Sequence, residues 1–571
     1  MLFHTWTFAI FLAIVLPVFF LLRKTRFWIA WLMLASYFFY GWWNPYYLSL
    51  VFYSTVMDYF LVTLMDRCPR EGTKPAASGA VTCVTGNSGR DGSPNRPRTP
   101  RGGVPTVDVI GRVDVAGRLT RLRFDDRVLK HAFVVAAAAA VSLLALAFFG
   151  PTTLRPALIM LSVLVLLMAL GALFSSRRIW LFISVFNNLA LLLFFKYAGF
   201  LVQNINGLLA QAHLAAALPE PATLMPYGFT YLLPVGISFF TFQSLSYTID
   251  FYLGNVPRER NFLRFATFVC FFPQLMAGPI ERAKHLLPQF QKFPEIRLLN
   301  FTDGASLFLV GLFKKLALAN YLACYVDRVY DNPSAFDAPA LLMATFAFAW
   351  QIYFDFSGYT DMARGIAKVM GFNLILNFRN PYLATGIGEF WTRWHISLSS
   401  WFRDYVYIPL GGNRAGKLLT YRNLLITFAV SGIWHGASWT FLAWGLLHGA
   451  GVMITRELER SAFYSQRVPK AIKQAGVFLF VCFAWIFFRA TSLTDALLII
   501  RRIFTAPWHD PQMPALLLLM VGLVWLYEAL YESDWRVHLQ RAPVRVATAV
   551  FMILYLFLFS SGGGSFIYFQ F

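Results

Sequence analysis

Long stretches without a charged residue are the feature that most limits how this chain can fold. Residues 2–22, 27–57 and 423–455 contain no Asp, Glu, Lys or Arg, and roughly 20 apolar residues suffice for a helix to cross a bilayer. Apolar residues make up 58% of the 571-residue chain and charged residues only 13%, about half the charged fraction of soluble domains. These figures exclude a soluble multidomain protein. We predict an all-α, polytopic transmembrane helical protein.

Basic residues next to the apolar stretches predict the topology. Arg23, Lys24 and Arg26 directly follow residues 2–22, and cytoplasmic loops collect Lys and Arg. This loop is therefore predicted to be cytoplasmic, and the N-terminus extracytoplasmic. Because residues 2–22 lack a basic leader and a small-residue cleavage site, we expect a retained first helix rather than a secretory signal. The same bias accounts for the net charge of +21, so no nucleic-acid partner is expected.

Shifts in composition divide the chain into four segments. Residues 1–66 are predicted to form N-terminal transmembrane helices, with a tight turn at Asn44-Pro45. Residues 67–130 are rich in Lys, Arg, Gly and Pro and are predicted to form a disordered cytoplasmic loop. That loop is interpreted either as a solvated linker or as a segment that binds anionic lipid. Residues 131–176 are predicted to form a transmembrane hairpin, and residues 177–571 a core of further helices.

Residues 355–422 combine many aromatic residues with turn-forming Pro, Gly and Asn. Irregular backbone at membrane depth survives only where protein or a water-filled cavity surrounds it. This segment is therefore predicted to form short, tilted or re-entrant helices around a site.

His435 is the histidine most unlike the others, because it lies within the uncharged stretch 423–455. A polar ring in such a stretch is a candidate functional residue, and the neighbouring Gly432 and Gly436 leave room for a ligand or a second helix. The alternative is an imidazole that only ties two helices together, and residue type alone leaves both interpretations open. His448, further along the same stretch, is interpreted as structural.

His395 is the second candidate. A helix over residues 390–404 would place His395 in an aromatic stripe, because its neighbours recur at spacings of three and four. The stripe would consist of Trp391, His395, Leu398 and Phe402. Arg393, Arg403 and Asp404 would lie close enough to form a polar cluster that orients the imidazole. The alternative is an amphipathic interfacial helix with aromatic anchors.

The sequence contains no motif typical of a metal-binding, nucleotide-hydrolysing or serine-hydrolase site. The nine histidines and five cysteines show no metal-ligand spacing, so no metal site is predicted. A Walker loop and a G-x-S-x-G nucleophile motif are also absent from the sequence, so nucleotide hydrolysis and serine-hydrolase chemistry have no support.

Taken in order, several motifs resemble those of the membrane-bound O-acyltransferase family, and within it the bacterial alginate O-acetylation type. They are residues 234–243, 247–250, 272–280, 355–362, 391–401, 407–412, 431–439 and 566–571. The resemblance covers most of residues 180–571 and the first 65 residues. Residues 67–174 depart from the family pattern and resemble an insertion.

The resemblance implies a helical scaffold around a tunnel and an O-acyltransferase activity, which makes residues 177–571 the catalytic core. By the same resemblance His435 is the catalytic histidine, acting as general base, and His395 is a second essential site residue. We expect other residues to line the tunnel or to support the site. These are Trp434, Gly436, Trp394, Arg393 and Asp404.

The resemblance also implies the reaction partners. The acyl donor is expected to be a cytoplasmic thioester, acetyl-CoA, with no permanently bound cofactor. The acceptor is expected to be an extracytoplasmic polysaccharide such as alginate, reached through an extracytoplasmic acetyltransferase partner, and the protein is expected in the lipid of the cytoplasmic (inner) membrane. Peptidoglycan, another exopolysaccharide, or D-alanyl transfer to teichoic acid remain alternatives. So do a transporter without acyl transfer and a nonenzymatic export scaffold.

Overall fold

The computed structural model describes residues 1–68, 176–225, 231–414 and 416–560, with the single positions 162, 165 and 169. The described residues form helices and contain no strand, which confirms the all-α prediction. Six of their helical segments are long and apolar enough to cross a membrane, so the multi-pass prediction is also confirmed. They are Pro45–Arg67, Arg177–Gln211, Leu298–Tyr330, Ala338–Val369, Lys470–Arg489 and Ala542–Phe559.

Three predicted features lie outside the described residues. They are the loop over residues 67–130, apart from its first two positions, the hairpin over 131–176, apart from isolated positions, and the terminal motif 566–571.

Residues 1–67 form three helices, of which the third, with the turn before it, is among the six candidate spans, while the first two are shorter apolar helices. The three are α1 (Trp6–Leu22), α2 (Trp28–Gly41) and α3 (Leu48–Arg67). The stretch 27–57 divides at a short 3-10 turn, Pro45–Tyr47, where Asn44 Oδ1 accepts a hydrogen bond from the Tyr46 N–H at 3.0 Å. The predicted turn at Asn44-Pro45 is therefore confirmed.

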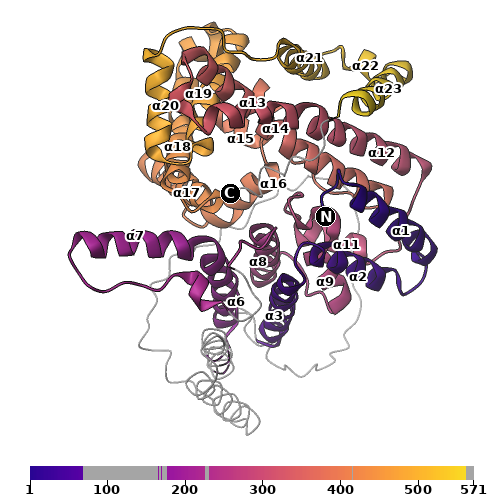
Figure 1. The fold of residues 1–571 in the computed structure, drawn as a ribbon. Coiled ribbons are helices and arrows are strands. Elements are labelled where there is room, and N and C mark those ends of the chain that lie inside the picture. The colour runs from indigo at the N-terminus through magenta and orange to yellow at the C-terminus, as the bar shows by residue number, and fades with distance from the viewer. Residues whose placement is uncertain are drawn as a thin grey trace, which may run out of the picture.

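A buried carboxylate ties α3 to α6 (Arg177–Leu192) and α8 (Ile237–Leu253). Asp58 of α3 accepts hydrogen bonds from Ser184 at 2.7 Å, from Asn188 at 2.9 Å and from Ser244. Because a carboxylate within a membrane protein must find polar partners, these contacts fix the three helices against each other. Figure 1 shows them side by side. A π-helical turn, η3 (Leu193–Tyr197), joins α6 to α7 (Ala198–Gln211), which extends away from the bundle.

Short helices and two long ones form the middle of the chain. They are α9 (Phe262–Cys270), α10 (Phe272–Leu275), α11 (Ala283–Phe290), α12 (Leu298–Phe313), α13 (Asn320–Tyr330) and α14 (Ala338–Val369). A π-helical turn, η5 (Lys314–Ala319), links α12 to α13. The backbones of α12 and α14 touch at glycines, since a Cβ added to Gly311 would lie 2.4 Å from the Gly358 carbonyl oxygen. Small residues allow this close packing between membrane helices.

The last third of the chain carries the site. Its helices are α15 (Ile387–Arg393), α16 (Ile396–Phe402), α17 (Lys417–His435), α18 (Trp439–Arg460), α19 (Lys470–Arg489), α20 (Leu493–Thr505), α21 (Ala515–Tyr531), α22 (Arg536–Leu539) and α23 (Ala542–Phe559). Two π-helical turns also occur here, η8 (Arg403–Tyr407) after α16 and η9 (Phe463–Arg467) after α18.

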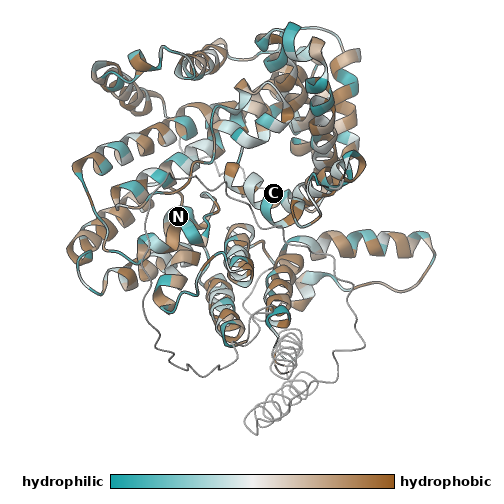
Figure 2. Ribbon diagram, turned by 180° about the vertical axis from the view of Figure 1, so that it is seen from behind, coloured by the Kyte–Doolittle hydropathy of each residue, from teal (hydrophilic) through white to brown (hydrophobic). Residues whose placement is uncertain are grey.

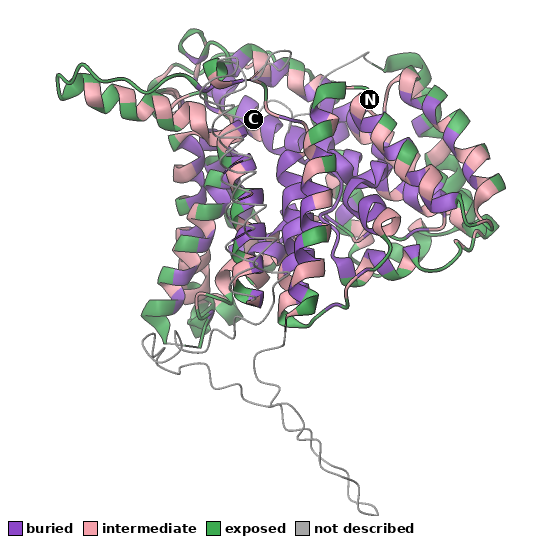
Figure 3. Ribbon diagram, turned by 90° about the horizontal axis from the view of Figure 1, so that it is seen from below, coloured by how far each residue is buried: buried purple, intermediate pink, exposed green. Residues whose placement is uncertain are grey.

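Hydrophobic residues occur along most of the helices, as the colouring of the ribbon in Figure 2 shows, and many of them are exposed. Trp6 and Leu21 of α1 are 87% and 79% exposed, and Phe557 of α23 is 87% exposed. In a soluble protein such apolar surface would need a partner, whereas here lipid is that partner. Buried residues gather on the inward faces of the long helices (Figure 3).

Candidate active site

His435 lies where α17 ends. The chain leaves the helix at Gly436, whose backbone is extended, and α18 begins at Trp439. The His435 side chain is buried at 5% exposure. Its ring centroid lies 4.9 Å from that of Trp434 and 4.9 Å from that of Trp444. The end of α17 thus presents an imidazole between aromatic rings.

The glycines around His435 bring α18 close to α17. A Cβ added to Gly432 would lie 2.3 Å from the Phe441 carbonyl oxygen, and one added to Gly436 would lie 2.1 Å from the Phe441 ring. Of the two uses predicted for these glycines, close approach of a second helix is therefore the one that the structure confirms.

His395 is fully buried at a break between two helices. Its φ of +42° lies in the left-handed region, so α15 ends at Arg393 and α16 begins at Ile396. Asn377 holds this break, because its carbonyl oxygen accepts from the Ile396 N–H at 2.9 Å and its Oδ1 lies 3.1 Å from His395 Nδ1. The prediction of one continuous helix over residues 390–404 is wrong.

The aromatic surroundings predicted for His395 are present, but they come from other parts of the chain. The ring centroid of Phe356 lies 4.6 Å away and that of Trp434 lies 6.4 Å away. Trp434 therefore contacts both imidazoles, and its ring connects the two candidate histidines.

Three predicted supporting residues lie in other contacts. Trp394 is buried against Trp485, with ring centroids 5.2 Å apart. Arg393 pairs with Glu389 at 2.8 Å and with Glu532 at 2.5 Å. Asp404 pairs with Arg282 at 3.2 Å. Two members of the predicted polar cluster, Arg403 and Asp404, pair at 2.9 Å, whereas the third, Arg393, has other partners.

His448 is buried in α18, and its Nδ1 accepts a hydrogen bond from the Trp391 indole N–H at 3.2 Å. This contact ties α18 to α15 and agrees with the structural interpretation. Among the described residues, no group of three His, Cys, Asp or Glu side chains is placed to hold a metal ion.

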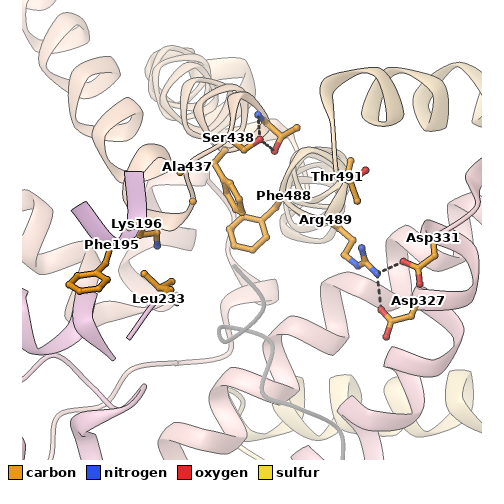
Figure 4. A pocket seen from close by; sticks show the side chains of 14 residues that line it. Phe195, Lys196, Leu233, Asp327, Asp331, Ala437, Ser438, Phe488, Arg489 and Thr491 are labelled. Carbon is orange, nitrogen blue, oxygen red and sulfur yellow. Dashed lines mark hydrogen bonds and ion pairs between the residues drawn. The ribbon is translucent and has the colours of Figure 1, made fainter. Parts of the chain in front are cut away.

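A pocket of about 610 Å³ opens beside the end of α17. Figure 4 shows Lys196 on one side of it, Ser438 and Phe488 near the middle and Arg489 next to Phe488. Arg489 pairs with Asp327 at 2.8 Å. The wall of this pocket therefore combines hydroxyl, charged and aromatic groups.

Two smaller pockets also border α17, the first of them at the same end of the helix. One of about 60 Å³ is lined by His435, Trp434, Lys196 and the turn at Gly236. Gly236 is required there, since its φ is +76° and a Cβ would lie 2.6 Å from the Leu275 carbonyl oxygen.

The second small pocket, of about 220 Å³, lies on the other side of an aromatic layer and is lined by Ser431, Phe402 and Arg403. The rings of Phe402 and Trp434, one from each pocket wall, lie 6.3 Å apart. Aromatic side chains therefore separate the two small pockets.

Sequence reasoning missed Lys196 and Asn377. Lys196 lies at the π-helical turn η3, and its Nζ donates to the carbonyl oxygens of Trp434 at 2.7 Å and His435 at 2.8 Å. A signal was available, because Lys196 is the one charged residue between the uncharged runs 179–195 and 197–219. Asn377 gave no such signal, since its role depends on a contact with a distant part of the chain.

Several known proteins are similar to this chain. The sequence model of the MBOAT, membrane-bound O-acyltransferase family matches residues 144–494. The chain is 44% identical over 316 residues to a probable alginate O-acetylase AlgI of Pseudomonas putida, covering 55% of this chain and 62% of the relative. It is 38% identical over 353 residues to a peptidoglycan O-acetyltransferase of Helicobacter pylori, covering 57% and 64%. It is 27% identical over 272 residues to a teichoic acid D-alanyltransferase of Bacillus subtilis, covering 44% and 68%. The chain thus matches about six-tenths of the length of the first two relatives.

Proposed function

This chain belongs to the membrane-bound O-acyltransferase family, and we propose that it transfers an acetyl group from a thioester donor to a hydroxyl acceptor at His435. The observation that carries the proposal is the position of His435. Its ring lines a small pocket at the end of α17, and Gly436 after it lines the 610 Å³ pocket. A base there can meet an acceptor that enters through the 610 Å³ pocket, while the rings of Phe402 and Trp434 lie between it and the 220 Å³ pocket.

In the proposed reaction the His435 imidazole takes the proton from the acceptor hydroxyl as its oxygen attacks the thioester carbonyl. The carbon–sulfur bond then breaks, and the imidazolium returns the proton to the leaving thiolate, which departs as a free thiol. The buried Trp434 indole N–H has no hydrogen-bond partner in the described part of the chain, and we assign it to a substrate oxygen. His395 would contact the Trp434 ring and help to fix its position.

The distribution of basic residues supports opposite entry routes. Lys417 begins α17, Arg460 ends α18 and Lys470 begins α19, so the positive-inside bias places these helix ends in the cytoplasm. The 220 Å³ pocket extends toward these ends through Arg403 and Tyr407, which suits a cytoplasmic donor such as acetyl-CoA. The 610 Å³ pocket lies at the opposite helix ends, which suits an extracytoplasmic acceptor.

We propose a polysaccharide acceptor, alginate in the first instance, with delivery by an extracytoplasmic acetyltransferase partner in the cytoplasmic membrane. The relative of Pseudomonas putida, named for alginate O-acetylation, supports this choice. The relative of Helicobacter pylori, named for peptidoglycan O-acetylation, supports peptidoglycan as the second candidate.

The test uses purified protein in proteoliposomes with labelled acetyl-CoA. We expect cleavage of the thioester in the wild type and a loss of about 10² to 10⁴-fold in His435→Gln, the range for general-base assistance. His448→Gln is the matched control, because it changes another buried histidine of the same region, and it should retain activity within a few-fold. Wild-type cleavage by His435→Gln would refute the assignment. Movement of label across the bilayer without thioester cleavage would instead identify a transporter.

A further inference from the structure

Three successive carbonyl groups end α17, and one turn of a distant helix satisfies all three. Tyr197 donates its hydroxyl to the Ile433 carbonyl oxygen at 3.0 Å. Lys196, the residue before it, donates to the carbonyl oxygens of Trp434 and His435 at 2.7 and 2.8 Å. The last carbonyls of a helix lack partners within the helix, so these two side chains close the end of α17.

The π-helical turn makes this contact possible. Residues 193–197 form a π-helical turn between α6 and α7, and such turns inside longer helices frequently occur at functional sites. Here the turn presents two adjacent side chains to one helix end. The hydrogen bonds join positions that are 236 to 239 residues apart in the sequence.

The positive charge of Lys196 suits the C-terminal end of α17, which it contacts. The C-terminal end of a helix carries a partial negative charge equivalent to roughly half an electron, and the Lys196 ammonium contacts two of the carbonyl oxygens that bear it. Its Nζ also lies 5.7 Å from the centroid of the Trp434 ring. Lys196 therefore contacts the backbone of His435 and the ring that separates His435 from His395.

Lys196 also lines both the 60 Å³ and the 610 Å³ pockets. Figure 4 shows its side chain near those of Phe195 and Leu233. The contacts of Lys196 with the end of α17 therefore lie beside both pockets.

We propose that Lys196 is the positioning residue for His435, which holds the end of α17 so that the imidazole faces both reactants. This inference rests on the proposed acyl transfer for its kinetic consequence. Its structural content, that the Lys196 charge fixes the turn after α17, stands on the contacts alone.

The experiment compares Lys196→Met, Lys196→Arg and Tyr197→Phe in proteoliposomes. Tyr197→Phe is the matched control, because it removes a hydrogen bond from the same turn to the same helix end but leaves the charge. Two quantities are measured. The first is kcat and KM for thioester cleavage, and the second is hydrogen exchange of the backbone amides of residues 431–441.

We expect Lys196→Met to lower kcat about 10 to 100-fold, because a displacement of about 1 Å at a reacting group has this effect, with the donor KM within about two-fold of wild type. Exchange in residues 436–441 should accelerate. Lys196→Arg should recover most of kcat because it restores the charge, and Tyr197→Phe should stay within about three-fold of wild type. If Lys196→Met is not recovered from membranes, Lys196→Gln takes its place, since it removes the charge and keeps a donor.

The proposal is overturned if the charge-removing variant leaves both kcat and exchange unchanged. It is also overturned if Tyr197→Phe lowers kcat as much, since Lys196 would then be one general helix contact among others. Failure of the proposed acyl-transfer function would be recognised separately. If His435→Gln keeps full activity, the acyl-transfer assignment fails, while the exchange measurement still decides whether Lys196 fixes the end of α17.

Discussion

Replacing Gly432 by alanine tests whether the crossing of α17 and α18 sets the position of His435. The added Cβ would lie 2.3 Å from the Phe441 carbonyl oxygen and 3.2 Å from the Gly445 Cα. Ordinary van der Waals contact begins near 3.4 Å, so the two helices must separate by about 1 Å. Both atoms in conflict belong to backbone, and rotation of a side chain therefore cannot relieve it.

Overpacking of this kind costs about 1–3 kcal/mol. The better helix propensity of alanine returns up to about 1 kcal/mol, and when this is returned in full the net destabilisation is about 0–2 kcal/mol. His435 lies three residues after Gly432, so its ring moves with the separating helix. A displacement of about 1 Å lowers the rate by roughly 10²-fold, and we expect the loss of activity to exceed what the fall in stability explains.

The assay measures the thermal midpoint of the detergent-solubilised protein together with its rate of thioester cleavage. Gly476→Ala in α19 is the control, because a Cβ there meets nothing within 4 Å, and it should not destabilise the protein. If Gly432→Ala matches Gly476→Ala in both measurements, the helix crossing does not position the site.

Two further predictions concern residues away from His435. Asp58→Ala leaves the donors Ser184, Asn188 and Ser244 without their shared acceptor and should lower the thermal midpoint through a loss of about 2–3 kcal/mol. Asp66→Ala, at the more exposed pair with Arg258, should cost less than about 1 kcal/mol, and equal effects would contradict the role of the Asp58 contacts. His285 hydrogen-bonds to Glu281 at 2.7 Å, which raises the pKa of His285 above its ordinary value. Its contribution to stability is therefore complete below the unfolded-state pKa and is lost as pH rises through the higher folded-state pKa. Because this imidazole is 39% exposed, the stability difference between wild type and His285→Gln should be below about 1 kcal/mol at pH near 6 and should shrink toward pH 9, and a difference that grows with pH would contradict the argument.

The sequence was informative where a single local pattern decides the structure. Uncharged stretches predicted apolar helices, and Asn44-Pro45 predicted a turn, because hydrophobic length and turn chemistry act over neighbouring residues. The glycines beside His435 predicted a close approach for the same reason.

The features of the site that the sequence did not predict depend on contacts between residues that are separated in the sequence. A spacing of three and four favoured a continuous helix through His395, but Asn377, 18 residues earlier, stabilises a left-handed residue there. Lys196 marks a boundary between two apolar runs in the sequence, and only the folded chain shows that it contacts the end of α17. Local periodicity carries no information about either partner.

The aromatic layer at Trp434 and Phe402 has a consequence for the electrical behaviour of the membrane. Rings between the 60 Å³ and 220 Å³ pockets are a poor medium for hydrated ions, which would lose their water among apolar side chains. In the proposed reaction only an uncharged acyl group would pass this layer, and its transfer would then do no work against the membrane voltage.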